Sequence, residues 1–310
     1  MLRVGLLVGR ECSFPDALIQ EVNTRDSDVV AEYIKLGEIS SLSERKYDVI
    51  VDRISHEVIF YQPFLKLAAL NGAIVINNPF WRIADDKFFG TALAERLGIA
   101  VPKTLILPSH SYPESIVPES LSNLKYPLDW GAIVRYTGLP AILKPYWGGG
   151  WRDVHRVNSV EELISVYNES GQMCMMLQEF IHWQQYVRCI CIGKKKILVT
   201  NWDPRKSHFE RYRNVDQNLD PSLVERVTAE AVKINEALGY DMNTVEFAIR
   251  DGIPYAIDFM NSAPDFDITS LTEVYFPWVV QAMTDLVIRR AQQARKKRPK
   301  YRWDALMDLG

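Results

Sequence analysis

The chain has 310 residues, of which 47% are hydrophobic and 24% are charged, so its composition excludes a mainly disordered or fibrous protein. It carries 36 Lys and Arg against 39 Asp and Glu, and this net charge of −3 gives no global attraction to nucleic acid or to an anionic membrane. We therefore expect neither as a partner. Charged residues or prolines also interrupt every apolar run before it could span a bilayer.

The four cysteines, Cys12, Cys174, Cys189 and Cys191, form no Cys-x-x-Cys pair and have no His at metal-like spacing. A zinc site is therefore not expected. Cys189 and Cys191 are two positions apart in a strand-like run, so they lie on one face and cannot easily bond to each other. A reducing, cytoplasmic environment fits this pattern best.

Residues 2–76 alternate short apolar runs with helical ones, which predicts a small parallel α/β lobe. Gly72 stands where a C-terminal cap belongs after a helix that ends at Leu70, and it frees the chain to enter the strand Ala73–Ile76. The lobe is expected to end near Asn78-Pro79.

A helix is expected over Asp85–Leu97, followed by a strand that ends at Leu107. Four prolines make residues 108–127 a surface excursion to which no role can be assigned. Asp129 caps the next predicted helix, and Gly138 ends it. Ser159, with Glu162 as its capping-box partner, and Asp220 cap two later helices. The later predictions are strands at 141–145, 153–157, 175–181, 186–192 and 195–201, helices at 159–167, 223–238 and 272–294, and a hairpin of 244–249 with 255–260.

Lys144 closes a buried strand and is followed by Gly148, Gly149 and Gly150. One ammonium and several backbone N–H groups of a glycine loop can surround phosphate oxygens. The same segment is also compatible with a flexible hairpin tip that carries a solvated lysine.

Glu246 lies on one strand of the last predicted hairpin, and Asp258 and Asn261 lie on its partner. Acidic groups and an amide at such strand ends can converge on Mg²⁺, which prefers oxygen ligands and keeps phosphate as a co-ligand. The alternative places Glu246 and Asp258 on the solvent face of an ordinary hairpin.

Together and in this order, these features resemble the ATP-grasp family, in particular its carboxylate–amine ligases of the glutathione synthetase, RimK and D-alanine–D-alanine ligase types. Asp85-Asp86-Lys87 and the segment Leu177–Ile181 are similar to two further family segments, so that the resemblance covers about 85–286. It implies an α/β and α+β architecture, with a Rossmann-like pre-ATP-grasp lobe before the ATP-grasp fold.

The implied division has four parts. Residues 1–84 form the N-terminal lobe, residues 85–178 the central lobe with the glycine loop, residues 179–294 the C-terminal lobe with the metal site, and residues 295–310 a basic tail. We expect the basic side chains in this region to form a solvated helix end and not a patch that binds nucleic acid; they are Arg289, Arg290, Arg295, Lys296, Lys297, Arg298 and Lys300.

The resemblance also implies the site residues. Lys87 and Lys144 would be the pair of phosphate-binding lysines, together with the glycine loop. Gln178 would hydrogen-bond the exocyclic amine of adenine, and Glu179 and Ile181 would contribute backbone groups. The implied metal ligands are Glu246, Asp258 and Asn261.

Two arginines complete the implied site. Arg188 matches an arginine that the family places near the transferred phosphoryl group, and a guanidinium suits developing oxyanion charge. Arg205, with Arg211 and Arg213 in the same loop, is a weaker candidate for holding the substrate carboxylate or the γ-phosphate.

The last metal motif departs from the family pattern. Relatives usually have Glu-x-Asn, whereas this chain has Asp258-Phe259-Met260-Asn261, so that Asp258 is displaced by one position. In a regular strand this displacement turns the side chain to the other face. A bulge at Phe259-Met260 could restore the face; otherwise metal binding is weakened, or Asp265 or Asp267 takes part.

The resemblance thus predicts a ligase that uses ATP and Mg²⁺, or Mn²⁺ in its place, to activate a carboxylate as an acyl phosphate and join it to an amine, releasing ADP and phosphate. The substrates would be small molecules, with amino acids or peptides among the candidates, and a homo-oligomer is compatible with the sequence. Two alternatives stay open: a non-catalytic ATP-binding module, and an ATP-dependent phosphotransferase.

Overall fold

The computed structural model describes the whole chain except residues 82–85, 150–151, 208–209, 213–217, 297–299 and 308–310. The chain divides into two compact units. Unit 1 comprises Met1–Ile83, Val187–Val245 and Asn261–Gly310, and unit 2 comprises Ala84–Tyr186 and Glu246–Met260. The four-part division implied by the resemblance stays a prediction.

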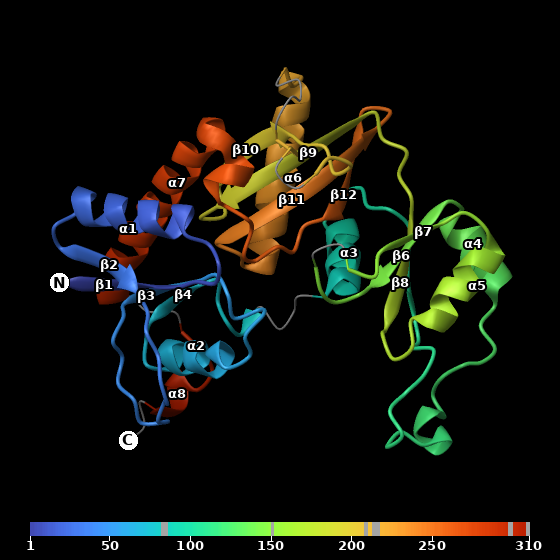
Figure 1. The fold of residues 1–310 in the computed structure, drawn as a ribbon, viewed down its shortest axis with the longest axis horizontal. Coiled ribbons are helices and arrows are strands. Elements are labelled where there is room, and N and C mark those ends of the chain that lie inside the picture. Colours follow the sequence, from blue (N-terminus) through green and yellow to red (C-terminus); the bar gives the residue numbers. More distant parts are fainter. Residues whose placement is uncertain (82–85, 150–151, 208–209, 213–217, 297–299, 308–310) are drawn as a thin grey trace. The chain divides into compact units, whose positions relative to one another are not determined.

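The N-terminal lobe is a four-stranded parallel sheet in the order β2-β1-β3-β4, as the alternating pattern predicted. Helices α1 and α7 pack on one face of this sheet, and α2 covers the other (Figure 1). The bounds are β1 (Leu2–Leu7), α1 (Ser13–Arg25), β2 (Val29–Tyr33), β3 (Val49–Asp52), α2 (Tyr61–Leu70), β4 (Ile74–Ile76) and α7 (Ile268–Lys296).

A second sheet has the strand order β10-β9-β11-β12, and α6 packs against β10. The carboxylate of Asp220 caps α6 by accepting hydrogen bonds from the N–H groups of Ser222 and Leu223, and Gly239 ends the helix with a φ of 73°. The bounds are β9 (Gln185–Ile192), β10 (Lys196–Asn201), α6 (Pro221–Leu238), β11 (Met242–Arg250) and β12 (Ile253–Asp258).

The two hairpins of this sheet differ in detail from the expectation. Ile192 pairs with Lys196, so the first loop contains three residues, 193–195, instead of two. Arg250 pairs with Ile253, so the second turn is only Asp251-Gly252, with φ values of 53° and 73°. Two consecutive residues with positive φ match the twist of the strands, which favours this tight turn.

Unit 2 contains an antiparallel sheet in the order β5-β8-β6-β7. Helices α4 and α5 pack on one face over a buried cluster that includes Leu143, Leu163 and Leu177. Because side chains alternate along a strand, Lys144 and Gln178 lie on the opposite face. The bounds are β5 (Thr104–Leu107), α4 (Trp130–Thr137), β6 (Ala141–Pro145), β7 (His155–Val157), α5 (Val160–Glu169) and β8 (Met175–Glu179).

The helix caps of unit 2 follow the sequence closely. Asp129 accepts a hydrogen bond from the N–H of Ala132 at the start of α4, and Ser159 accepts one from the N–H of Glu162 at the start of α5. The Glu162 carboxylate, expected to bond the N–H of Ser159, instead accepts from that of Asn158. The excursion at 108–127 contains one short 3₁₀ helix, Pro118–Leu121.

Beyond the basic end of α7, aromatic side chains near the end of the chain pack together. Tyr301 stacks on Trp303 with 4.7 Å between ring centroids and packs edge-on against Phe80 at 5.1 Å. The side-chain amide of Asn78 donates a hydrogen bond to the Tyr301 hydroxyl at 3.0 Å. Helix α8 (Asp304–Met307) follows these contacts.

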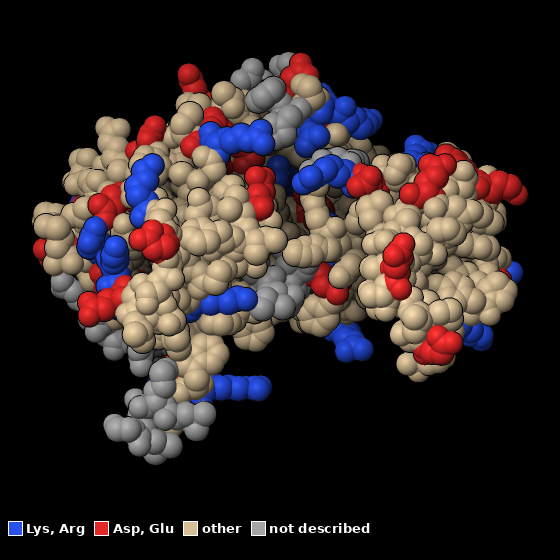
Figure 2. All heavy atoms as spheres, turned by 60° about the horizontal axis from the view of Figure 1, so that its bottom comes forward, with Lys and Arg blue, Asp and Glu red and all other residues tan. Residues whose placement is uncertain are grey.

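Lys and Arg side chains are interspersed with Asp and Glu side chains on the face shown in Figure 2. In the part of the chain that the structure describes, no helix is both long and apolar enough to cross a membrane.

Helix α3 (Lys87–Arg96) packs unusually closely against the segment that follows β12. A Cβ atom on Gly90 would lie 2.5 Å from the Met260 sulfur and 3.2 Å from the Phe259 ring. The absence of a side chain at Gly90 therefore sets how near the first turn of α3 comes to the end of β12.

We expect Gly90→Leu to lower the free energy of unfolding by roughly 1–3 kcal/mol, because overpacking forces α3 away from Phe259 and Met260. The matched control is Gly131→Leu in α4, where an added Cβ first meets side-chain atoms of Arg135 and Asp129. Urea titration of both variants measures the difference. Equal stability of the two variants would contradict the close packing.

Candidate functional site

A β-bulge brings Glu246 and Asp258 directly opposite each other. Phe247 pairs with Ala256, but Glu246 pairs with Asp258, so Ile257 is an extra residue in β12. This extra residue turns Asp258 onto the face that Glu246 occupies. The bulge that the metal motif requires therefore exists, but it precedes Asp258; its predicted position at Phe259-Met260 is wrong.

Lys87 forms an ion pair with Asp258. Its ammonium lies 3.1 Å and 3.0 Å from the two carboxylate oxygens. The lysine is the first residue of α3, and its backbone N–H donates to the carbonyl of Tyr146 at 3.1 Å, next to the glycine loop. A predicted phosphate ligand and a predicted metal ligand thus contact each other in unit 2.

Lys144 is the buried centre of the site, with 9% of its surface exposed. Its ammonium donates a hydrogen bond to the side-chain oxygen of Gln178 at 2.9 Å. Burial, and then the nearby charge of Lys87, lower the pKa of Lys144 to about 8, while Asp258 and Glu246 oppose the shift. Four charges from separate segments therefore act on one another in unit 2.

Gln178 is held on both sides of its amide. Its oxygen accepts from Lys144, and its nitrogen donates to the Thr104 hydroxyl at 3.1 Å. An amide oxygen has two lone pairs and the nitrogen has two protons, so a nucleobase could still bond to either atom. The sequence did not identify Thr104 as a site residue. It lies beside Gln178 because the two residues pair across β5 and β8.

Glu179 points to the other face of the sheet, where its carboxylate lies 2.9 Å from the Arg250 guanidinium. The hydrogen bond to Glu179 raises the pKa of Arg250. The backbone N–H of Glu179 donates to the carbonyl of Lys103 at 2.8 Å. Any backbone contribution of Glu179 to a ligand would therefore come from its carbonyl. Ile181, two positions further along the chain, is buried with 3% of its surface exposed.

Tyr186 was also missed as a site residue. Its hydroxyl donates a hydrogen bond to the Glu246 carboxylate at 2.9 Å, and its ring packs against Trp183 at 5.4 Å. This contact orients Glu246. One signal in the sequence was the position of Tyr186 two residues before Arg188, near the start of the same strand.

The donor set fits a Mg²⁺ ion that keeps phosphate and water ligands. No cluster of three or more His, Cys, Asp or Glu side chains able to hold a metal occurs among the described residues. Glu246 and Asp258 supply two carboxylates on one face, and Mg²⁺ commonly takes only one or two from the protein.

The glycine loop is only partly described. Gly148 has a φ of 107°, a conformation that side chains rarely adopt, and an added Cβ on Gly148 or Gly149 would meet no atom within 4 Å. Open space beside a glycine backbone suits close approach of a ligand. Gly150 lies outside the described residues.

Asn261 belongs to unit 1, where a chain of buried amides fixes its backbone. The N–H of Asn261 donates to the side-chain oxygen of Asn243 at 2.8 Å, and the Asn243 nitrogen donates to Asn235 at 3.0 Å. Asn243 and Asn235 are fully buried. The position of Asn261 therefore depends on these two side chains.

Asn77 holds the two segments that flank this chain of amides. Its side-chain oxygen accepts from the N–H groups of Asp241 at 2.7 Å and Met242 at 2.9 Å. Its nitrogen donates to the carbonyls of Met242 at 2.7 Å and Ser262 at 3.3 Å. One buried side chain thus satisfies four backbone groups.

We expect the free energy of unfolding to decrease in the order wild type, Asn77→Asp, Asn77→Ala. The aspartate retains the acceptor for two N–H groups but loses both donors, whereas alanine leaves all four groups without this partner. Each buried group left unsatisfied costs roughly 1–3 kcal/mol. Urea titrations would contradict this role if Asn77→Ala were as stable as the exposed control Asn123→Ala.

Arg188 lies in unit 1 and is 9% exposed. Its guanidinium donates to the hydroxyls of Tyr212 at 3.2 Å and Thr244 at 3.1 Å, and it lies 5.0 Å from the ring of Trp202. Its place near a transferred phosphoryl group stays a prediction.

Arg205 forms a two-point ion pair with Asp203 and is 72% exposed in its side chain. The hydrogen bond from Arg205 lowers the pKa of Asp203. Arg211 lies over the Trp202 ring at 5.2 Å, and Arg213 is outside the described residues.

The two downstream acids considered as alternative metal ligands are engaged at the start of α7. Asp267 accepts a hydrogen bond from the Ser13 hydroxyl at 2.7 Å, and Asp265 accepts one from the Ser270 hydroxyl. These contacts give both acids a structural role.

Lys144→Met should stabilise the protein at pH 7 by roughly 1–3 kcal/mol, since it removes a buried ammonium. The pKa of Lys144 is about 8 in the folded state and 10.5 when unperturbed, so the unfolded state binds more protons between these values. The wild type therefore gains stability as pH rises from about 8 to 10.5, and the advantage of the variant shrinks.

Urea titration at pH 7 and pH 10 measures this effect. The control is Lys125→Met, because Lys125 is exposed in the same unit and its replacement should change stability by less than about 0.5 kcal/mol. A Lys144→Met variant less stable than the wild type at pH 7 would refute the assignment of a destabilising buried charge.

Comparison with known proteins finds sequence similarity over part of the chain and a shared fold over most of it. No family model matches the sequence. Human mitochondrial pyruvate carboxylase is 28% identical over 153 residues, which are 44% of this chain but 13% of that protein. The chain thus covers only a small part of the curated relatives that it matches.

Solved structures match over nearly the whole chain. A RimK domain ATP-grasp protein from Sphaerobacter thermophilus has a TM-score of 0.67 and 18% identity, and covers 92% of this chain and 99% of its own. D-alanine–D-alanine ligase from Bacillus anthracis has a TM-score of 0.67 and 20% identity, with 96% and 99% covered. At these identities the likeness shows a shared fold.

The solved neighbours include complexes with nucleotide. The Bacillus anthracis ligase complexed with ATP has a TM-score of 0.64 and 17% identity, with 97% of this chain and 100% of that chain covered. The ATP-grasp ligase PsnB, complexed with minimal precursor, Mg and ADP, has a TM-score of 0.61 and 14% identity, with 94% and 98% covered.

Proposed function

We propose that this chain, which has the ATP-grasp fold, is an ATP-dependent carboxylate–amine ligase that works through an acyl phosphate. The observation that carries the proposal is the convergence of Lys87, Lys144, Glu246 and Asp258 within unit 2. Two ammonium groups suit the phosphates of a nucleotide, and two carboxylates suit the metal ion that accompanies it. A structural ion pair would need only one group of each charge.

The proposed roles follow from the contacts. Lys144 and Lys87 bind phosphate oxygens, and Glu246 and Asp258, with Asn261, hold Mg²⁺ or Mn²⁺. The metal ion would neutralise phosphate charge. Since Lys87 already neutralises Asp258, a metal ion that takes over this carboxylate would release the Lys87 ammonium for the nucleotide. Tyr186 keeps Glu246 oriented through its hydroxyl.

The proposed reaction has two steps. An oxygen of the substrate carboxylate bonds to the γ-phosphorus of ATP as ADP leaves. The nitrogen of an amine then attacks the acyl carbon, phosphate leaves, and the nitrogen loses a proton. In the first step the protein mainly aligns the reactants and neutralises charge, and a permanently charged guanidinium such as that of Arg188 suits the developing negative charge.

The substrates belong to the proposal as well. D-alanine–D-alanine ligase is among the similar structures, and so are PsnB and the macrocyclase MdnC, both seen with precursor peptides. These neighbours support an amino acid or peptide as the carboxylate or amine substrate here. The four cysteines are free thiols, which fits the cytoplasmic location that we propose.

ADP release with Mg²⁺ and ATP, screened over carboxylates and amines, should identify an active pair. Lys144→Met should lower kcat/KM for ATP by at least about 100-fold, because it removes the buried ammonium. Lys125→Met in the same unit should retain wild-type activity. A Lys144→Met variant of full activity would exclude the assigned role.

Isotope transfer separates the ligase from the two alternatives. With ¹⁸O in the substrate carboxylate, a ligase releases phosphate that carries one ¹⁸O atom together with an amide product. A phosphotransferase forms ADP and a stable phosphorylated product. A non-catalytic module binds ATP without forming ADP under any substrate pair, and either of these two outcomes overturns the proposal.

A further inference from the structure

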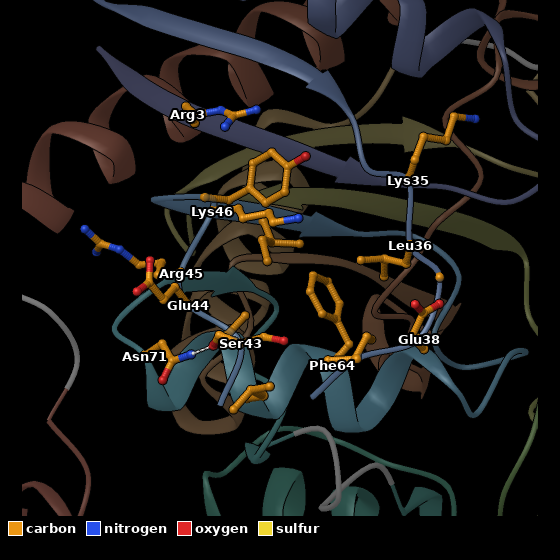
Figure 3. Close-up of a pocket in the computed structure, with 16 residues that line it drawn as sticks. Arg3, Lys35, Leu36, Glu38, Ser43, Glu44, Arg45, Lys46, Phe64 and Asn71 are labelled. Atoms are coloured by element: carbon orange, nitrogen blue, oxygen red, sulfur yellow. Dashed lines mark hydrogen bonds between the residues drawn. The ribbon is translucent and has the colours of Figure 1, made fainter. Parts of the chain in front are cut away.

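A pocket of about 410 Å³ lies in the N-terminal lobe, outside the proposed nucleotide site (Figure 3). It forms beneath residues 34–48, which connect β2 to β3. Parallel strands are usually connected through a helix, but residues 34–48, all of them described, form neither helix nor strand. The pocket fills the space between this segment, which we name the crossover segment, and α2.

The walls of the pocket are mainly apolar. They come from the crossover segment, from β3 and from α2, and include Leu36, Ile39, Tyr47, Ile50, Phe64 and Leu67. Ile50 is 1% exposed and forms the floor, whereas the other five side chains are only half-buried. Those five would lose further contact with water if an apolar molecule entered, and such burial favours binding.

One wall is held firmly against the sheet. A Cβ atom on Gly5 in β1 would lie 2.6 Å from Ile34 and 2.9 Å from the Tyr47 ring, so both side chains rest directly on the β1 backbone. The Arg3 guanidinium covers the Tyr47 ring at 5.2 Å and is itself paired with Glu32. Tyr47 therefore cannot move inward to fill the pocket.

The crossover segment is also tied to the end of α2. The side-chain amide of Asn71 donates to the carbonyl of Ser43 at 2.7 Å, as Figure 3 shows. The Arg45 guanidinium lies 3.3 Å from the carbonyl of Gly72 and 3.4 Å from the Asp48 carboxylate. These anchors fix the crossover segment relative to α2, and small-molecule sites are usually largely preformed.

Charged side chains of both signs line the pocket beside its apolar walls. Figure 3 shows the Lys46 side chain directed to the middle of the pocket, whereas Arg45 points away. Glu38 and Glu44 stand at the rim with Lys35. Lys46 is exposed, so its ammonium stays hydrated and can contact an anionic group that reaches the mouth of the pocket.

We propose that this pocket binds a small apolar monocarboxylate, with its hydrocarbon body between Tyr47, Phe64 and Leu67 and its carboxylate on Lys46. The volume lies in the usual range of about 300–1,000 Å³ for small-molecule sites. The inference does not depend on the proposed ligase activity, since no residue of the pocket belongs to unit 2.

Isothermal titration calorimetry of the full chain with 2-naphthoate tests the proposal, with 2-naphthamide as a neutral probe of the same shape. We expect one saturable site, and an affinity for naphthoate about tenfold higher, in keeping with a charge-assisted contact. Saturating Mg-ATP should leave the affinity unchanged. Absence of saturable binding, equal affinity for the two probes or displacement by Mg-ATP would each overturn the proposal.

Two variant pairs locate the ligand. Leu67→Trp fills the pocket and should weaken both probes at least tenfold, whereas Leu70→Trp, on the same helix but outside the pocket, should not. Lys46→Met should reduce naphthoate affinity to the level of naphthamide, and Lys66→Met should have no effect. If the circular dichroism spectrum shows that Leu67→Trp is not folded, Ile39→Trp is used in its place, because it fills the pocket from the crossover segment. The proposed binding site is wrong if a folded Leu67→Trp or Ile39→Trp variant, or the Lys46→Met variant, binds naphthoate as tightly as the wild type.

Discussion

Two ammonium groups and two carboxylates lie in a small part of unit 2, and the charge of the buried Lys144 is governed by its interactions with the other three. Burial and Lys87 both act against its charge, while Asp258 and Glu246 favour it. A buried charge is tolerated only when opposite charges and hydrogen bonds compensate its lost hydration. Lys144 is therefore an unfavourable buried charge, which is one reason why we propose that the site binds a polyphosphate with its metal ion.

The rest of unit 2 serves this arrangement. The bulge at Ile257 turns Asp258 toward Glu246, and the bare backbone of Gly90 lets α3 bring Lys87 to Asp258. One face of the β5-β8-β6-β7 sheet carries the packed core beneath α4 and α5, which leaves the other face for Lys144 and Gln178.

Much of this was accessible from the sequence. The capped helices at Asp129, Ser159 and Asp220 begin where their side chains predicted, because a cap is a contact between residues three positions apart or fewer. The ATP-grasp resemblance also proved correct for the fold. The bulge was predicted at the wrong residue, since strand register is set by the partner strand and not by local preference.

The sequence by itself determined the elements, their order and the residue types that could meet a nucleotide, because periodicity and capping are local. Only the tertiary structure decided that Lys87 pairs with Asp258 across 171 positions, that Tyr186 orients Glu246, and that Asn243 holds Asn261. It also decided that the crossover segment leaves a pocket above Ile50. Such contacts depend on how distant segments pack against each other. A single stretch of residues does not specify the position of a distant segment to within a few tenths of an ångström.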